Sequence, residues 1–384
     1  MTMSRRERIL AALNRQQPDR VPIDLGGTYA STVYFTAYEK LKRHMGLEHE
    51  TELGMRRARV AIPDLSMLDY FDVDTRLISL SSYEGGLQRD IDEDNFVDEW
   101  GAVWGKTGDG PYLNVGGPFQ HDDISLAEVE NHDWPDPDNP GLYRGFRKRA
   151  QALREASDHA IILNIRLGVV HEAQFVRGYS EWLVDLYRRP EIASRLMEFG
   201  SHFCAKVAEN ALAEAGEFID IVFFGDDMST QQTTVFSPDI YRKMIKPHQA
   251  MVIGRVKKAA DVKVVFHCCG AIADLIDDLA EIGVDAINPV QVAAKGMEPE
   301  RLKRDFGDKM AFWGGVDTQR VMPQCNEDEV RQETRHIIDT LGRGGGLVLT
   351  AVHNIQPDVP PANVLAMYNE ARRYGGGLSS GTKG

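Results

Sequence analysis

The chain has few cysteines for its length. Four cysteines in 384 residues do not form a disulfide framework. Cys204 and Cys325 stand alone, and Cys268 and Cys269 are adjacent, which rarely suits a bridge. A chain of this length buries a core large enough to be stable without disulfides. The cysteine usage is therefore typical of a reducing compartment.

Long apolar runs and an excess of positive charge are also missing. No stretch of about 18 apolar residues is present, as a membrane helix would require. The amino-terminal MTMSRRERIL lacks the apolar core of a secretory signal. We therefore expect a cytoplasmic protein with no membrane span. The net charge of −14 argues against nucleic acid or an anionic membrane surface as a general partner.

Short apolar runs alternate regularly with helical patterns along most of the chain. Ser4 and Glu7 form a capping-box pattern before a first helix. Apolar runs that suit a parallel sheet buried on both faces predict an α/β fold, a (β/α)8 TIM barrel. A doubly wound open sheet is the alternative, but no Gly-x-Gly-x-x-Gly follows the first strand. The predicted strands lie near residues 21–25, 75–80, 160–165, 218–224, 263–267, 284–289, 310–314 and 346–350.

The regular pattern is interrupted between about residues 81 and 157. Aromatic residues and glycines mix with acids there, and Pro-Asp turns follow in WPDPDNPG. This composition predicts an inserted β-hairpin and loop region after the second strand. We expect residues 1–384 to form a single barrel domain with a disordered tail at about 377–384.

Polar side chains recur at the carboxyl ends of the predicted strands. In a barrel these ends carry the catalytic groups, so the recurrence predicts a site at that rim, although loop starts are polar anyway. His171 with Glu172, and Gln319, also follow strand ends. The residues that we expect to bind a small-molecule substrate are Asp24, Arg166, Asn288, Gln291, Asp317, Asn354 and Gln356.

The sequence FHCCG ends the fifth predicted strand. Side chains alternate in an extended segment, so His267 and Cys269 point the same way and Cys268 points the other way. His-x-Cys offers two ligands to one zinc ion, and a catalytic zinc usually takes three protein ligands. His353, from the end of the last strand, is the best third candidate. Weaker candidates for this ligand are Asp226, Asp227 and Glu172.

Other interpretations of these residues stay open. A histidine and two cysteines could simply fill a core. A cysteine nucleophile with a histidine base is disfavoured, because His267 and Cys268 face opposite sides of a strand. Asp226 and Asp227 either cap a helix or line a loop, or else act as catalytic carboxylates on a cation or a proton. For Arg166, a salt bridge competes with anion binding.

Several segments together resemble the uroporphyrinogen decarboxylase superfamily. The resemblance covers almost the whole chain and implies the (β/α)8 fold. The segments that carry it are RERILAALNRQQPDRVPID, FGDDMSTQQTTVFSPDIYRKMIKPHQ, VVFHCCG, IGVDAINPVQ, FWGGVDTQ and VHNIQPDVPPANVLAMYNEAR.

Within the superfamily, the chain looks more like the cobalamin-dependent methyltransferases of the methylcobamide:coenzyme M type than like the true decarboxylases. The decarboxylases carry an arginine-rich loop after the first strand, whereas DLGGTYAST has no arginine. The methyltransferases hold zinc with His-x-Cys and a cysteine from the last strand. His267 and Cys269 match the first two positions, and His353 stands near the place of the absent cysteine.

The resemblance implies zinc-dependent methyl transfer between a corrinoid and a small molecule such as a thiol or a methoxylated compound. The chain has no D-x-H-x-x-G corrinoid-binding motif, so we expect a separate corrinoid protein or free methylcobalamin as the methyl carrier. The alternative is a cofactor-free decarboxylase of a uroporphyrinogen-like tetrapyrrole, with Asp226 or Asp227 stabilising a protonated intermediate. A non-catalytic binding barrel is a third hypothesis. A homodimer is compatible with a barrel of this size.

Overall fold

The computed structural model describes residues 2–48, 50–165 and 168–376. The predicted substrate residue Arg166 and the predicted disordered tail at 377–384 lie outside the described residues. The prediction of a single domain over the whole chain therefore stays a prediction.

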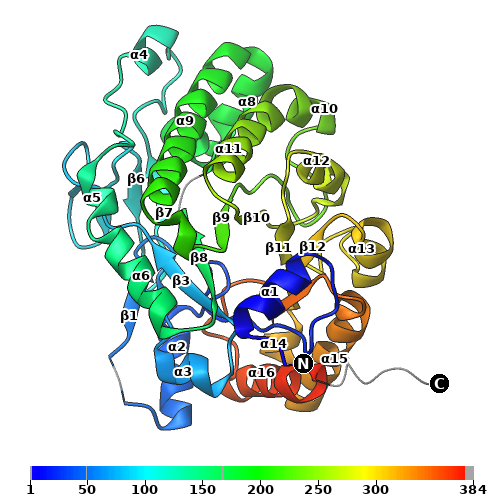
Figure 1. Ribbon diagram of the computed structural model, residues 1–384. Helices are drawn as coiled ribbons and strands as arrows, with labels where there is room; N and C mark the ends of the chain where they lie inside the picture. Colours follow the sequence, from blue (N-terminus) through cyan, green and yellow to red (C-terminus); the bar gives the residue numbers. More distant parts are fainter. Residues whose placement is uncertain (1, 49, 166–167, 377–384) are drawn as a thin grey trace.

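Seven parallel strands form one curled sheet, in the order β13-β12-β11-β10-β9-β8-β3 (Figure 1). This arrangement confirms the predicted barrel class, and each of these strands overlaps a predicted one. Their bounds are β3 (Thr75–Ser79), β8 (Ala160–Asn164), β9 (Ile221–Gly225), β10 (Lys263–His267), β11 (Ala286–Val290), β12 (Ala311–Val316) and β13 (Leu347–Ala351).

The segment predicted as the first strand fills the gap between β13 and β3 without forming a regular strand. Ile23 makes a single parallel bridge to Leu349 of β13, and its carbonyl accepts a hydrogen bond from the Asp74 N–H next to β3 (2.8 Å). Pro22 has no N–H to extend this ladder, and Gly26 (φ 72°) turns the chain away. The strand predicted at 21–25 is thus reduced to one bridge that joins the two edges of the sheet.

Helices follow the strands and cover the outside of the sheet (Figure 1). Ser4 caps the first helix and Glu7 returns the capping bond, as predicted. The α-helices are α1 (Arg5–Leu13), α2 (Phe35–Met45), α3 (Leu65–Tyr70), α4 (Leu126–Glu130), α5 (Pro140–Tyr143), α6 (Phe146–Ala156), α7 (Val170–Arg177), α8 (Tyr179–Arg188), α9 (Pro190–Ala215), α10 (Pro238–Ile240), α11 (Lys246–Ala259), α12 (Ile276–Glu281), α13 (Pro299–Phe306), α14 (Val321–Gln324), α15 (Glu327–Ile337) and α16 (Pro361–Gly375). Shorter 3-10 and π turns lie at Gly216–Phe218, Tyr241–Ile245, Ala273–Leu275 and Ile338–Gly342.

Side chains that point into the barrel pack into a core of their own. This inner cluster includes Trp313, Phe223 and Val265 from three strands, together with Ile9 and Leu13 of α1. The helix α1 therefore closes the amino-terminal end of the barrel, and it lies in front of the strands in Figure 1. Any site must open at the opposite end, where the strands finish.

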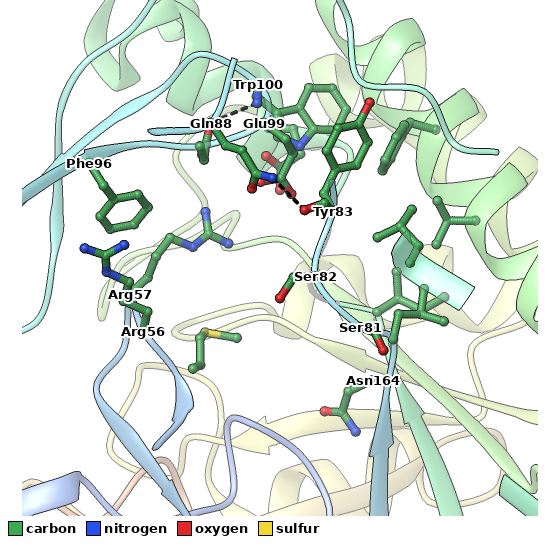
Figure 2. A pocket seen from close by; sticks show the side chains of 18 residues that line it. Arg56, Arg57, Ser81, Ser82, Tyr83, Gln88, Phe96, Glu99, Trp100 and Asn164 are labelled. Atoms are coloured by element: carbon green, nitrogen blue, oxygen red, sulfur yellow. Dashed lines mark hydrogen bonds between the residues drawn. The ribbon is translucent and has the colours of Figure 1, made fainter. Parts of the chain in front are cut away.

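The predicted insertion after β3 is a four-stranded antiparallel sheet in the order β4-β5-β6-β7. The strands are β4 (Arg89–Asp90), β5 (Asn95–Val97), β6 (Val103–Gly105) and β7 (Leu113–Gly116). The side chain of Asn114 donates a hydrogen bond to the carbonyl of Phe175 in α7 (3.2 Å), which attaches this inserted sheet to the barrel. A cavity lies between the inserted sheet and the barrel (Figure 2).

A second antiparallel pair, which the sequence did not indicate, precedes α3. It consists of β1 (Glu52–Met55) and β2 (Val60–Ile62). The turn between these strands carries Arg56 and Arg57, and both line the cavity of Figure 2. Within the described residues, none of the helices combines the length and apolar composition needed to cross a membrane.

Candidate metal centre

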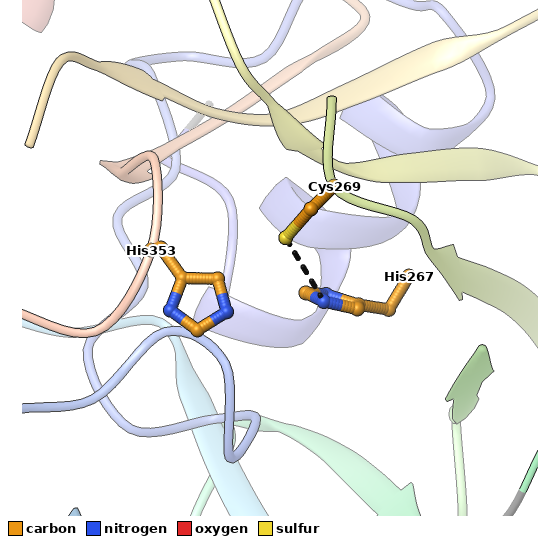
Figure 3. Close-up of side chains that lie close together, drawn as sticks. All are labelled: His267, Cys269 and His353. Carbon is orange, nitrogen blue, oxygen red and sulfur yellow. Dashed lines mark hydrogen bonds between the residues drawn. The ribbon is translucent and has the colours of Figure 1, made fainter. Parts of the chain in front are cut away.

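His267, Cys269 and His353 come together at the carboxyl ends of β10 and β13 (Figure 3). One ligand atom from each lies within 4.8 Å of the other two. The Nε2 atom of His267 is 3.5 Å from the Sγ atom of Cys269, and the two imidazole rings are 5.5 Å apart at their centroids. The three residues predicted as metal ligands are thus neighbours in space, although His353 follows Cys269 by 84 positions in the sequence.

The spacing and chemistry of these donors fit a zinc ion. Two ligands of one tetrahedral zinc lie about 3.5 Å apart, given Zn–N of about 2.0 Å and Zn–S of about 2.3 Å. The pair His267 and Cys269 already has this separation, whereas His353 has to approach further. Two imidazoles and one thiol leave a fourth position open, as in catalytic zinc sites.

Neighbouring polar groups fix the orientation of the donors. The Nδ1–H of His267 donates to the Asn288 Oδ1 atom (2.8 Å), so Nε2 keeps its lone pair for a metal. The Gln291 side chain accepts a hydrogen bond from the Gly270 N–H (2.6 Å), directly after Cys269. Asn288 and Gln291 therefore hold the segment from His267 to Gly270 in place. Their predicted contact with a substrate stays a prediction.

Burial controls the protonation of the donors. Burial, reinforced by nearby His267, lowers the pKa of His353 to about 4, although Asp227 acts in the opposite direction. The ring is neutral at pH 7, as a metal ligand must be. Burial and the Asp227 carboxylate raise the pKa of the Cys269 thiol well above its usual value. A metal that binds Cys269 therefore has to displace a proton.

Asp227 faces the metal centre. Its carboxylate accepts a hydrogen bond from the Cys269 N–H (2.8 Å) and lies 3.6 Å from His171 Nε2 and 3.7 Å from His267 Nε2. Burial raises the pKa of the Asp227 carboxyl, but the contacts with His171 and His267 outweigh this and lower it below its usual range. Asp227 therefore places a fixed negative charge beside the metal centre.

Asp226 points away from the three donors, into the barrel wall. One carboxylate oxygen accepts hydrogen bonds from the N–H groups of Val170 (2.7 Å) and His171 (3.0 Å) at the start of α7. The other accepts a hydrogen bond from the Gln249 side chain (2.8 Å). The sequence left open whether Asp226 and Asp227 cap a helix, line a loop or act as catalytic carboxylates. The structure places Asp226 in a helix cap. Among the described residues, the Asp226 side chain makes no hydrogen bond to Cys269 or His353.

A cavity of about 340 Å³ lies beside the metal centre and is lined by His267, His353 and Asp227. His171, Glu172 and Asn354 also line it. Asn354 at the same time accepts a hydrogen bond from the Thr32 N–H (3.1 Å). A volume of this size suits a small molecule.

Among the described residues predicted to bind a substrate, Asn354 alone lines this cavity. The residues that do not line it are Asn288, Gln291, Asp24, Asp317 and Gln356. Asp24 is fully buried and accepts hydrogen bonds from the Trp313 indole (2.8 Å) and the Thr75 hydroxyl (2.5 Å). Asp317 accepts hydrogen bonds from the N–H groups of Gln319 and Arg320 in its own turn. Gln356 is exposed at the surface.

Aromatic residues and one arginine form much of the remaining cavity wall. The guanidinium of Arg57 lies 4.5 Å from the ring centre of Trp104 and 5.3 Å from that of Phe175. The loop after the first strand lacks arginine, but the β1-β2 turn brings a cation into the cavity. The sequence alone does not point to these residues, because nothing in RRAR at 56–59 indicates where the turn folds. The aromatic members are Tyr29, Trp104, Tyr112, Phe175, Phe223 and Phe224.

Comparison with known proteins identifies the family. A model of the uroporphyrinogen decarboxylase family matches residues 119–374. The chain belongs to this family. Uroporphyrinogen decarboxylase from Paraburkholderia phytofirmans is 25% identical over 199 residues, which are 51% of this chain and 50% of that protein. The enzyme of the same name from Methylococcus capsulatus is 26% identical over 191 residues, or 49% and 51% of the two chains. The chain thus spans about half the length of these curated relatives.

A solved structure extends the likeness to almost the full chain. A methyltransferase from Methanosarcina mazei superposes with a TM-score of 0.67 and covers 97% of this chain and 99% of that one. The sequence identity is 17%, so the likeness is one of fold.

Proposed function

We propose that the protein is a zinc-dependent methyltransferase that moves a methyl group between a corrinoid and a small molecule. The convergence of His267, Cys269 and His353 on one point beside a cavity carries this proposal. The family membership and the fold shared with a methyltransferase support it. A free cysteine ligand also suits the reducing cytoplasm, which is the compartment that we propose.

Zinc bound by the three donors would lower the pKa of a thiol or hydroxyl group of the substrate and hold it as an anion. Asn288 keeps His267 in the orientation that this binding requires. Because His353 is neutral where a thiolate would be negative, these donors compensate less of the metal charge than one histidine and two thiolates would. Asp227 compensates part of that charge from the side of the site.

The size of the cavity bears on the methyl carrier. A corrinoid macrocycle is far larger than a cavity of about 340 Å³, so it has to approach from outside the barrel. We therefore propose a separate corrinoid protein, or free methylcobalamin, as the partner. The aromatic wall excludes water from the space where the small molecule would bind.

Two measurements test the proposal. Because the three donors form a single site, elemental analysis of the purified protein is expected to give about one zinc ion per chain. The His267→Ala, Cys269→Ala double variant is expected to lose this zinc. Methylcobalamin is then incubated with protein and a panel of thiols, and loss of its cobalt–carbon absorbance reports transfer. Full transfer activity in the metal-free double variant would show that the metal centre is not used.

A decarboxylase acting on a uroporphyrinogen-like tetrapyrrole is the second candidate. The name of the curated relatives favours it, and the Asp227 carboxylate beside the cavity could stabilise a cationic intermediate. The cavity of about 340 Å³ is small for a tetrapyrrole with eight carboxylates, and Arg57 is its one arginine among the described lining residues. Release of carbon dioxide from uroporphyrinogen, unchanged by removal of zinc, would favour this candidate over methyl transfer.

A further inference from the structure

A second cavity, of about 200 Å³, lies between the inserted sheet and the barrel. In Figure 2, Arg56 and Arg57 enter it from one side, Tyr83 lies across from them, and Trp100 lies above. Both this cavity and the one beside the metal centre are lined by Met55, Arg57, Ile165 and Glu172. A single molecule that extends past these four residues would therefore contact both cavities.

Two buried polar atoms on residues lining the second cavity have no hydrogen-bond partner among the described residues. They are the Glu172 Oε2 atom and the Trp100 Nε1 atom. Each residue is 2% exposed. A buried polar atom without a partner costs about 1–3 kcal/mol, so native proteins usually supply one from a ligand or water.

The Arg57 guanidinium also lacks an acidic partner among the described residues. It contacts the faces of Trp104 and Phe175, whereas neighbouring Arg56 is paired with Asp90 at 2.6 Å. An arginine held between aromatic rings keeps its N–H groups available for an anion. Arg57 therefore supplies an unpaired positive charge at the boundary of the two cavities.

The acidic residues of the same wall weaken this positive charge less than their number suggests. Asp98 accepts hydrogen bonds from the N–H groups of Trp100 and Ala102 and from the Trp104 indole. Burial raises the pKa of Glu172 to about 8, although Arg57 opposes the shift, so this carboxyl is mostly neutral at pH 7. Burial raises the pKa of Asp98 only to about 6, so Asp98 keeps its negative charge at pH 7, and Asp98 and Glu99 are the carboxylates on the wall that oppose Arg57.

We propose that the second cavity binds the carboxylate of a small organic acid, with Arg57 and the Trp100 indole N–H as its donors. The rest of the acid extends past Glu172 into the aromatic cavity and presents its methyl-bearing end to the metal centre. Binding of the acid follows from the cavity alone, and its role as a substrate rests on the proposed function. Aromatic residues such as Trp104, Phe175 and Phe223 line the second part of this path and favour an aromatic acid.

The test compares three probes of one shape in the full-length protein. Isothermal titration calorimetry measures the Kd of 4-methoxybenzoate, of its neutral amide and of 4-methoxybenzylamine. The acid is expected to bind at least tenfold more tightly than the amide. Equal binding of acid and amide, tighter binding of the amine, or no binding of any probe at millimolar concentration would overturn the proposal.

Variants assign the binding to the named groups. Arg57→Gln is expected to weaken acid binding at least tenfold and to leave amide binding within twofold. Trp100→Phe keeps one six-membered aromatic ring, removes the indole N–H and is expected to weaken acid binding severalfold. Arg89→Gln changes an exposed arginine of the inserted sheet that lines neither cavity, so both affinities should stay unchanged. An acid preference that survives in Arg57→Gln contradicts the assignment.

Transfer from methylcobalamin is measured separately in the same samples. Acid binding without any methyl transfer counts against the proposed function and leaves the binding site in place. Methyl transfer with equal binding of acid and amide counts against the binding site alone.

Discussion

The three consecutive residues His267, Cys268 and Cys269 have different surroundings. The outer two point to His353, whereas the Sγ atom of Cys268 accepts a hydrogen bond from the Met228 N–H (3.3 Å) within the core outside the strands. Alternation along an extended segment is the cause of this division. A proposed metal ligand, Cys269, and a packing residue, Cys268, are therefore adjacent in the chain and carry the same side chain.

Single substitutions of the two cysteines should separate these roles. Cys269→Ala is expected to lose zinc with little change in the stability of the metal-free protein. Cys268→Ala is expected to keep zinc and to lower the free energy of unfolding by about 1–2 kcal/mol, because it leaves a small cavity in the core. Zinc content and urea denaturation check both results. Loss of zinc in Cys268→Ala would contradict the division.

Glu172 should make the stability of the protein depend on pH. Its pKa is raised to about 8 in the folded chain by burial, so the folded state holds this proton more tightly than the unfolded state. The stability that the folded state gains by keeping the Glu172 carboxyl protonated is therefore lost progressively as the pH rises from about 4.5 to about 8. Glu172→Gln removes the titration, and its stability relative to the parent should rise by about 2–4 kcal/mol between pH 5 and pH 8.

Urea denaturation of both proteins at the two pH values measures this difference. Ser82→Ala changes another residue that lines the cavity of Figure 2 and serves as the control. Its free energy of unfolding should differ from that of the parent by the same amount at both pH values. A constant difference for Glu172→Gln would mean that Glu172 is ionised across the whole range.

At the scale of elements, the start of α7 joins two parts of the site. This helix carries His171 and Glu172 on the cavity wall and Phe175 against the inserted sheet. Asp226, from the end of β9, caps it through the N–H groups of Val170 and His171. The cap therefore sets the position of the cavity wall relative to β9 and to Asp227.

Removal of this cap should destabilise the protein. Asp226→Ala leaves two backbone N–H groups and the Gln249 amide without their acceptor, which costs about 2–3 kcal/mol of unfolding free energy. Asp226→Asn keeps an oxygen for the backbone N–H groups and should cost less. Denaturant titration compares the two variants. Equal stability of Asp226→Ala and the parent would show that the cap is dispensable.

At the scale of the whole molecule, the barrel is closed by charge pairing where its strand ladder is weakest. Asp74, which precedes β3 and is fully buried, lies 2.5 Å from Arg8 of α1 and 2.7 Å from Arg20. It also accepts a hydrogen bond from the Ile23 N–H (2.8 Å). The Asp74 carboxylate thus links the amino-terminal helix, the segment that completes the ring and β3, the first regular strand of the barrel sheet.

Breaking this link should affect the stability of the entire barrel. Arg8→Ala leaves a buried carboxylate with one cation fewer, which costs about 3–5 kcal/mol. Arg5→Ala, whose pairs with Asp72 and Asp158 are partly exposed, is the matched control and should cost about 1 kcal/mol or less. Thermal and urea unfolding measure both. Similar losses in the two variants would mean that burial of Asp74 does not matter.

The alternation of apolar runs predicted the barrel class and the regular strands, because a strand buried on both faces has to be continuously apolar. The apolar pattern could not predict that the first strand would be reduced to a single bridge at Ile23. It does not reveal that Pro22 and Gly26 interrupt the hydrogen bonding of this segment to its neighbouring strands. The inserted sheet was predicted as a region, but the packing of Asn114 on α7 was not.

For the site, the sequence by itself determined the chemical types and the strand ends from which His267, Cys269 and His353 project. It did so because strand ends of a parallel barrel meet at one rim and side chains alternate along a strand. Tertiary structure alone decided the different positions of Asp226 and Asp227 and the arrival of Arg57. Those positions depend on where α7, the β1-β2 turn and the inserted sheet pack, which are contacts between segments that have no local signal in the chain.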